Sequence, residues 1–253
     1  MFLSRIKLNI LGDPNMPRYG RDLLKNAYHL HQRLSRAFGA MEKRGPMRAP
    51  RSEETMNFLY RVDAPRILVL STQKPNWEKA FEGAGYLLAD SRELPESNPF
   101  DPPLEKGQRL QFMLRANPTR KACVSRSDGG QIKSKTGNSK RTVLITLEDR
   151  LAWLRRKGEA GGFLLVESGL QVIDEGWVHA WKTYREDKEK DEVRIEPKEN
   201  PHDADRHKGL SFRSVRYFGE LMVTDPIVIR KTLATGIGSG KAFGFGLLSI
   251  ARI

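Results

Sequence analysis

The chain has 253 residues, with 44 lysines and arginines against 31 aspartates and glutamates, and a formal net charge of +13. This length suits one large domain or two small ones, and a hydrophobic share of 38% excludes wholesale disorder. The excess of positive charge predicts a polyanionic partner and favours nucleic acid over an anionic membrane.

A single cysteine, Cys123, excludes an internal disulfide framework and a cysteine-rich zinc site. No apolar stretch approaches the roughly 18–20 residues that a membrane-spanning helix needs. Arg5 and Lys7 interrupt the position where a signal peptide would keep its apolar segment. We therefore expect a soluble, cytoplasmic protein with no membrane partner.

The first half of the chain has the element order of a split βαβ unit. Alternating residues indicate a strand over 1–11, and apolar residues at three- and four-residue steps indicate a helix over 21–41. The elements expected next are strands at 55–62 and 67–71, a short helix at 77–83, a proline-rich loop at 95–107 and a strand at 109–116. This β-α-β-β-α-β order is that of a ferredoxin-like unit.

A second unit is expected after a basic linker, rich in glycine and serine, over 124–141. Thr146 and Asp149 resemble a capping box at the start of a helix that ends at 161–162. The elements expected next are a strand at 163–173, a hairpin of 177–184 with 212–223, a helix that Asp225 and Pro226 open, and a strand at 247–253. We therefore predict an α+β fold of two tandem ferredoxin-like domains, at 1–123 and 142–253.

The positive charge is concentrated at residues 109–141, which contain nine lysines and arginines but a single acidic residue, Asp128. Lysine and arginine displace the counterions of a phosphate backbone, and a loop rich in glycine and serine adapts to the backbone's shape. The segment therefore favours contact with nucleic acid, although a loop charged only for solubility would have the same composition.

The tail contains five glycines from Gly236 to Gly246, together with Lys241. It lacks the P-loop pattern, because Thr235 stands at the first glycine position and Ala242 follows Lys241. It also lacks the order of a dinucleotide-binding motif, because a helix precedes it and a strand follows it. Glycines at this density favour a loop that faces RNA or packs closely over a simple turn.

One strip of the first helix carries groups suited to RNA cleavage. At about 100° per residue, Tyr28, His31 and Ser35 lie together at the edge of the apolar face, whereas His29 lies away from them. Histidine is the usual general acid or base for RNA cleavage. The alternative is a histidine that only packs at an interface. The sequence shows neither an H-E-x-x-H motif nor a carboxylate cluster, so it does not support a metal-dependent nuclease.

Three segments together resemble one family: the helix Asn26-Ala-Tyr-His-Leu-His-Gln-Arg-Leu34, the strand Leu114-Arg-Ala-Asn-Pro-Thr119, and the glycine-rich loop and strand at 236–249. The family is CasE, the CRISPR RNA-processing endoribonucleases of the type I-E Cascade system. The resemblance covers nearly the whole chain. It implies domains of the RNA-recognition-motif type, repeat hairpins of CRISPR precursor RNA as substrate, no metal cofactor, and retention of the product together with other Cascade subunits.

The resemblance also implies a mechanism. The ribose 2′-hydroxyl attacks the scissile phosphate, which leaves a 2′,3′-cyclic phosphate and a 5′-hydroxyl. His31 falls on the catalytic histidine, as general base or general acid, and Tyr28 falls on a tyrosine that orients the 2′-hydroxyl or phosphate. Lys241 is a candidate for stabilising the charged phosphorane. The candidate RNA contacts are Arg115, Arg120, Lys121, Lys133, Lys135, Lys140, Lys208, Arg213, Arg216, Gly238, Gly240 and Lys241.

Two other functions remain as alternatives. The same folds and charge would serve a non-catalytic RNA-binding subunit of a ribonucleoprotein, although such a subunit would not need the protonatable pair Tyr28 and His31. A DNA-binding architectural protein is less favoured, because the chain shows no helix-turn-helix, zinc finger or long basic helix.

Overall fold

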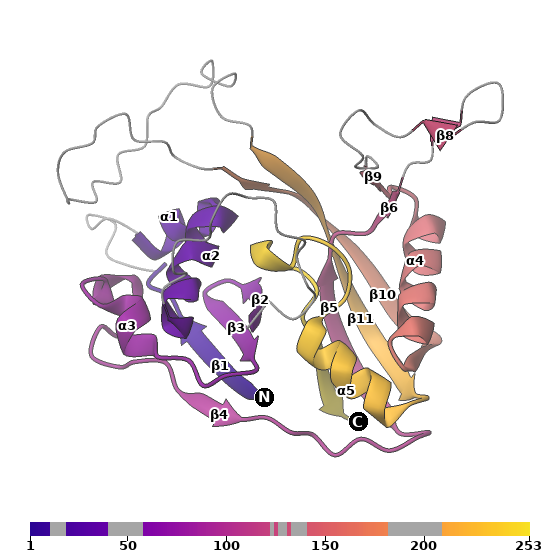
Figure 1. Cartoon of the computed structure of the whole chain (residues 1–253), viewed down its shortest axis with the longest axis horizontal. Coiled ribbons are helices and arrows are strands. Elements are labelled where there is room, and N and C mark those ends of the chain that lie inside the picture. The colour runs from indigo at the N-terminus through magenta and orange to yellow at the C-terminus, as the bar shows by residue number, and fades with distance from the viewer. Residues whose placement is uncertain (11–18, 40–57, 122–123, 126–130, 133–140, 182–208) are drawn as a thin grey trace.

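Two antiparallel four-stranded sheets with their helices form the body of the molecule (Figure 1). The structure is a computed structural model, and it describes residues 1–10, 19–39, 58–121, 124–125, 131–132, 141–181 and 209–253. None of the helices in these ranges is long and apolar enough to cross a membrane.

The first sheet has the strand order β2-β3-β1-β4, and every neighbouring pair is antiparallel. Helices enter between β1 and β2 and between β3 and β4, which is the topology of a ferredoxin-like fold. Side chains such as Ile6, Leu34 and Val69 form the core between sheet and helices. The elements are β1 (Phe2–Lys7), α1 (Tyr19–Lys25), α2 (Ala27–Ser35), η1 (Arg36–Phe38), β2 (Phe58–Asp63), β3 (Arg66–Ser71), α3 (Trp77–Phe81), η3 (Gly85–Leu87) and β4 (Ser97–Pro99).

The helix predicted over 21–41 is interrupted at Asn26, so the prediction of one continuous helix is wrong. The backbone of Asn26 is extended, and its side-chain oxygen accepts a hydrogen bond from the Tyr28 backbone N–H at 3.0 Å. Asn26 thereby ends α1 and caps α2. The predicted apolar face is nevertheless buried at Leu30 and Leu34, while Met41 lies outside the described residues.

The second sheet has the order β10-β11-β5-β12 and repeats the ferredoxin-like topology, with α4 and α5 as its two helices. Trp153, Leu154 and Tyr217 belong to its core. The elements are β5 (Arg109–Ala116), β6 (Thr119–Lys121), β7 (Val124–Ser125), β8 (Gln131–Ile132), β9 (Arg141–Val143), α4 (Leu147–Ala160), β10 (Phe163–Ala180), β11 (Leu210–Val223), α5 (Pro226–Thr235), η4 (Lys241–Phe243) and β12 (Leu248–Arg252).

The strand at 109–116 was predicted as the last strand of the first unit, and this assignment is wrong. Strand β5 pairs with β11 and β12 and is a central strand of the second sheet. The first sheet is completed by β4, inside the stretch predicted as a loop at 95–107. Proline is compatible with an edge strand that does not need its N–H, so Pro99 concealed β4. The chain therefore changes sheets between β4 and β5 and not at residue 123.

Two predicted helix starts are confirmed by their caps. Thr146 Oγ1 accepts a hydrogen bond from the Asp149 backbone N–H at 3.1 Å, and Asp225 Oδ1 accepts from Ile227 and Val228 at 2.9 and 3.0 Å. These side chains satisfy N–H groups that have no partner within the helix.

One long strand replaces two predicted segments. The strand at 163–173 and the first part of the hairpin arm at 177–184 both belong to β10, which ends at Ala180 and pairs with β11 on either side of a shift between Val166 and Gln171. A register shift between Asp174 and Gly176 marks the position where the two segments meet. Residues 182–184 of the predicted arm lie outside the described residues.

The two domains are joined by apolar and polar contacts. Leu59 and Leu70 of the first sheet pack with Leu247, which precedes β12. Arg61 donates from Nη1 to Ser249 Oγ at 2.6 Å, and Arg216 of β11 donates to Asp63 Oδ1 of β2 at 2.6 Å. Strand β2 is thus fixed against the second sheet by both kinds of contact.

The glycine-rich tail is folded tightly at its end. At Gly246, where φ is +87°, an added Cβ would lie 2.6 Å from the Ile237 carbonyl oxygen. Gly107 has a nearly identical φ of +85°, but an added Cβ there would have no atom within 4 Å. Substituting alanine at each of the two glycines therefore separates the cost of backbone strain from the cost of a steric clash.

We expect Gly246→Ala to lower the free energy of unfolding by about 3–4 kcal/mol, because strain and clash add. Gly107→Ala is the matched control and should cost about 1 kcal/mol, from strain alone. Urea denaturation of both variants measures the difference. Equal losses would show that the close packing of the tail contributes nothing to stability.

Candidate active site

Helix α2 is held at its first turn by Asn26, which is 2% exposed. In addition to capping α2, Asn26 Oδ1 accepts from the Trp181 backbone N–H at 3.2 Å, and its Nδ2 donates to the Trp181 carbonyl at 2.9 Å. Trp181 directly follows β10. One buried amide thus joins the start of the helix that carries Tyr28 and His31 to the second domain.

His31 is half-buried between aromatic rings from two domains. Its ring stacks on Phe58 of β2, with centroids 5.5 Å apart, and lies 6.4 Å from the ring of Phe243 in η4. One turn further along α2, Ser35 Oγ donates to the His31 carbonyl at 2.7 Å. The imidazole is therefore oriented by packing and lies beside the glycine-rich loop.

Tyr60 links α2 to this loop. Its hydroxyl is buried and lies 3.3 Å from the Ala27 carbonyl and 3.2 Å from the Ala242 carbonyl, so either oxygen can accept its single proton. Burial raises the pKa of Tyr60, so the hydroxyl stays a donor at neutral pH. Because Lys241 precedes Ala242 in η4, Tyr60 also fixes the backbone that carries Lys241.

The two histidines of α2 differ in their surroundings. His29 lies 6.3 Å from the Tyr28 ring, and burial lowers the pKa of His29. The ring contacts to Phe58 and Phe243 belong to His31. The ring of His31 thus lies beside the loop that contains Lys241, which agrees with the helical wheel.

Two of the predicted RNA contacts, Arg115 and Arg216, share the carboxylate of Glu175. Arg115 Nε donates to Glu175 Oε2 at 2.7 Å and to Ser214 Oγ at 2.8 Å, and Arg216 Nε donates to Glu175 Oε1. Burial alone would raise the pKa of Glu175, but the hydrogen bond from Ser214 and the charges of both arginines lower it. Glu175 is therefore a fixed anion between the two guanidinium groups.

Arg213, a third predicted contact, is held by Asp174. Its Nη2 donates to Asp174 Oδ2 at 2.7 Å, and Arg150 Nη2 donates to the same oxygen at 2.8 Å. Together with the ion pairs of Glu175 and Asp63, these contacts form one cluster in which five arginines share three carboxylates. Its members are Arg61, Arg115, Arg150, Arg213, Arg216, Asp63, Asp174 and Glu175. This cluster carries a positive surplus and presents guanidinium groups in set orientations.

The predicted glycines Gly238 and Gly240 are explained by close packing. An added Cβ would lie 3.0 Å from the Trp153 ring at Gly238 and 3.0 Å from the Phe245 ring at Gly240. The packing part of the prediction is confirmed, and contact of these glycines with RNA stays a prediction.

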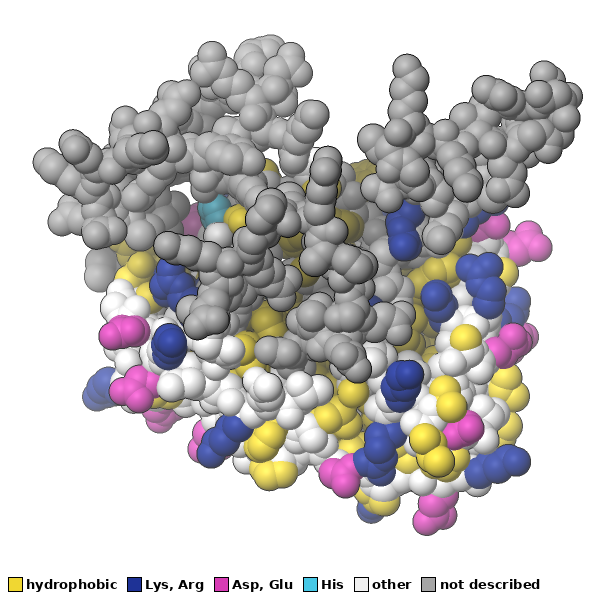
Figure 2. Space-filling view, viewed as in Figure 1, with side chains coloured by type: hydrophobic (Ala, Val, Ile, Leu, Met, Phe, Trp, Pro, Cys, Tyr) yellow, Lys and Arg dark blue, Asp and Glu magenta, His cyan; other side chains and the backbone are white. Residues whose placement is uncertain are grey.

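The other predicted contacts are only partly described. Arg120 is exposed on β6, and of Lys121 the structure describes the pairing with Arg141 of β9. Lys133, Lys135, Lys140 and Lys208 lie outside the described residues, as do His202 and His207. On the face that Figure 2 shows, the described Lys and Arg side chains are interspersed with Asp and Glu and form no single basic surface.

Sequence reasoning missed three residues that organise the site: Asn26, Tyr60 and Glu175. Asn26 had a signal, because asparagine is a preferred N-cap residue. Tyr60 and Glu175 act through contacts with residues distant in the sequence, and no local pattern marks such contacts.

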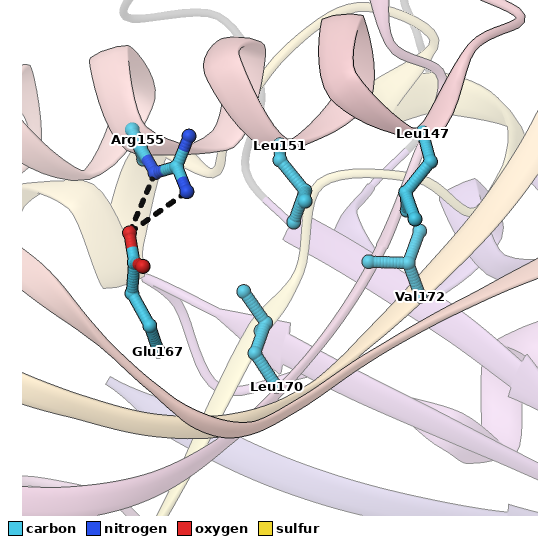
Figure 3. A pocket seen from close by; sticks show the side chains of 6 residues that line it. All are labelled: Leu147, Leu151, Arg155, Glu167, Leu170 and Val172. Atoms are coloured by element: carbon cyan, nitrogen blue, oxygen red, sulfur yellow. Dashed lines mark hydrogen bonds and ion pairs between the residues drawn. The ribbon is translucent and has the colours of Figure 1, made fainter.

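A pocket of about 220 Å³ lies between α4 and β10, and its lining is mostly apolar, unlike the candidate active site (Figure 3). Four of its six lining residues are Leu147, Leu151, Leu170 and Val172, and the other two, Arg155 and Glu167, form an ion pair at 2.7 Å. This lining does not suit acid–base chemistry. Within the described ranges, no three His, Cys, Asp or Glu side chains are grouped so that they could hold a metal ion.

Known proteins are similar to this chain along its whole length. The model of a family described as CRISPR associated protein matches residues 1–252. The CRISPR-associated endoribonuclease Cse3 of Thermus thermophilus is 31% identical over 99% of this chain and 100% of its own. The solved structure of CRISPR endoribonuclease Cse3 bound to a 19-nucleotide RNA has a TM-score of 0.65, with 27% identity over 99% of both chains.

A chain of a CRISPR RNA-guided surveillance complex shares the fold, with a TM-score of 0.52 and 24% identity over 100% of both chains. The fold prediction is confirmed by the two sheets and by these matches, and so is the resemblance to CasE. On the family match over 1–252 and the 31% identity to Cse3, this chain belongs to the CRISPR-associated protein family of the Cse3 (CasE) endoribonucleases.

Proposed function

We propose that this protein is an endoribonuclease that cuts CRISPR precursor RNA at repeat hairpins without a metal ion. The observation that carries the proposal is His31, oriented by Phe58 and Phe243 at the junction of α2 with the loop that contains Lys241. The relative Cse3 is named an endoribonuclease and has been solved with bound RNA, which supports the same class of activity and substrate here.

The reaction is an internal transfer at phosphorus. The ribose 2′-oxygen forms a bond to the scissile phosphorus as the bond to the 5′-oxygen breaks, so the products are a 2′,3′-cyclic phosphate and a 5′-hydroxyl. One proton leaves the 2′-hydroxyl and one reaches the 5′-oxygen. His31 takes the first or supplies the second. Tyr28 orients the 2′-hydroxyl or the phosphate, and Lys241 stabilises the charge that develops on the phosphorane.

The hairpin is recognised by its shape and phosphates, because side chains cannot reach the bases in the deep major groove of A-form RNA. Arg115, Arg213 and Arg216 stay candidates, and each would offer a phosphate a guanidinium group already oriented by a carboxylate. Further contacts come from the basic segment that includes Arg120. After cleavage the protein stays on its product and joins other Cascade subunits, in the cytoplasm.

We expect His31→Ala to slow cleavage of a repeat hairpin by about 10²–10⁴-fold, because general acid–base catalysis contributes that much. Single-turnover rates in EDTA measure the loss, and analysis of the RNA ends detects the cyclic phosphate. His29→Ala, two residues away on the same helix, is the matched control and should keep the rate. Full activity in His31→Ala would exclude His31 as the catalytic residue.

The same assay separates the two roles of His31. A substrate whose scissile 5′-oxygen is replaced by sulfur has a good leaving group, so it restores cleavage by His31→Ala if His31 is the acid and not if it is the base. Tight binding of the correct repeat with no cleavage by the unsubstituted protein would favour a non-catalytic RNA-binding subunit.

We expect Arg120→Ala to weaken hairpin binding and to make the slope of log affinity against log salt shallower by about one, because one phosphate contact is lost. Arg92→Ala removes the same charge from an exposed site in the first domain and should leave the slope unchanged. Filter binding at several salt concentrations measures both. An unchanged slope in Arg120→Ala would remove Arg120 from the interface.

Arg216→Ala should lower the stability of the protein, which we do not expect of Arg120→Ala. Arg216 joins Asp63 of the first sheet to Glu175 of the second. We expect a loss of about 1–2 kcal/mol in the free energy of unfolding, since Asp63 and Glu175 each lose one of two arginine partners and keep Arg61 and Arg115. Urea denaturation tests this, and an unchanged midpoint would show that the pairs do not support the domain junction.

A further inference from the structure

Strand β10 carries aromatic residues at alternate positions where it leaves the body of the second domain. Trp177 and His179 are separated by Val178, and alternation along a strand puts such residues on one face. Trp181 continues the same spacing directly after the end of β10 at Ala180. Trp177 is 52% exposed, His179 is exposed and Trp181 is half-buried. An exposed tryptophan is uncommon in a soluble protein and points to contact with a ligand or partner.

Cross-strand contacts confirm that the first two rings share a face. Trp177 pairs with Arg213 of β11, whose guanidinium carbon lies 5.3 Å from the Trp177 ring centroid. His179 pairs with Ser211, and the His179 Nδ1 lies 3.1 Å from Ser211 Oγ. Because Asp174 holds Arg213, the cation stays beside the indole.

The end of this row is fixed near the candidate active site. The backbone N–H and carbonyl of Trp181 both hydrogen-bond to Asn26, the residue that caps α2. Two residues after Asn26, Tyr28 lies in the first turn of α2. The aromatic face of β10 therefore runs toward the helix that carries Tyr28 and His31.

The chemistry of this face suits nucleobases. Aromatic side chains on strands stack on unpaired bases, and a neighbouring arginine adds a cation for the phosphate or the ring. The bases of a hairpin stem are stacked inside the duplex and cannot reach such a ring. Apart from the terminal base pair, only nucleotides outside the stem have a free face.

We propose that Trp177, His179 and Trp181 form a stacking site for single-stranded nucleotides that flank the repeat hairpin and lead to the scissile phosphate. This proposal rests on the proposed function. It adds a second mode of recognition, because phosphate contacts hold the stem whereas the aromatic face holds the flank.

The test compares a blunt repeat hairpin with the same hairpin carrying a single-stranded flank on the 5′ or 3′ side. His31→Ala is the background in every protein, so that the RNA stays intact. Trp177→Ala should weaken binding of the flanked hairpin by about tenfold, the effect of losing one stacked base, and should leave the blunt hairpin unchanged. Trp177→Phe should restore most of the affinity, because phenylalanine also offers a ring.

Ile173→Ala is the matched control. Ile173 is exposed on the same strand, lies before the register shift and pairs with Arg216. It should not change the binding of either RNA. An equal loss on both RNAs in Trp177→Ala, or no loss on the flanked one, would overturn the proposal and leave this face to a protein partner.

Fluorescence provides a readout that does not depend on affinity. Trp77 and Trp153 are buried, so Trp177 and Trp181 are the tryptophans that a bound base can reach. The flanked hairpin should quench the protein more than the blunt one, and Trp177→Phe should remove much of that difference. If neither RNA binds at all, the proposed function fails. If both bind and quench alike, only the stacking site is wrong.

Discussion

The position of the candidate active site depends on one buried hydroxyl. Tyr60 stands on β2 of the first domain, and its oxygen lies between the first carbonyl of α2 and a carbonyl of η4. An added Cβ at Gly244 would lie 3.0 Å from the Tyr60 ring, so the loop closes on this side chain only because a glycine is present. The helix that carries His31 and the loop that carries Lys241 are held by the same residue.

The carboxylates that pair with the arginines of the second sheet impose a second constraint, on the orientation of the guanidinium groups. Unpaired guanidinium groups this close together would repel one another and would be disordered by solvent. Glu175 and Asp174 cancel much of that repulsion and fix the orientation of Arg115, Arg213 and Arg216. Because the cluster keeps a surplus of positive charge, it could still attract a phosphate, and RNA binding at the proposed contacts would then need little reordering of side chains.

Local signals predicted the starts of α4 and α5, the strands with clear alternation and the pair of ferredoxin-like units. These signals failed where contacts between residues distant in the sequence determine the structure. Polar and apolar residues alternate along the strand at 109–116, but this pattern does not indicate which sheet the strand joins. Strand β4 has three residues and a proline, so its pairing with β1 comes from the fold and not from propensity. The position of His31 at the edge of the buried face was predictable from its place on the helix, whereas the role of Tyr60 was not, because its partners are 33 and 182 residues away.

The break at Asn26 explains why α2 is short. A continuous helix would have satisfied its own N–H groups along its length and would have needed no partner at this position. With the break, the amide of Asn26 caps α2 and binds the backbone of Trp181, so the helix begins at a contact with the second domain. Tyr60 fixes the same first turn through Ala27. The placement of Tyr28 and His31 is therefore a property of the two domains together, and RNA bound along β10 and β11, as proposed, would act on the strand end to which α2 is attached.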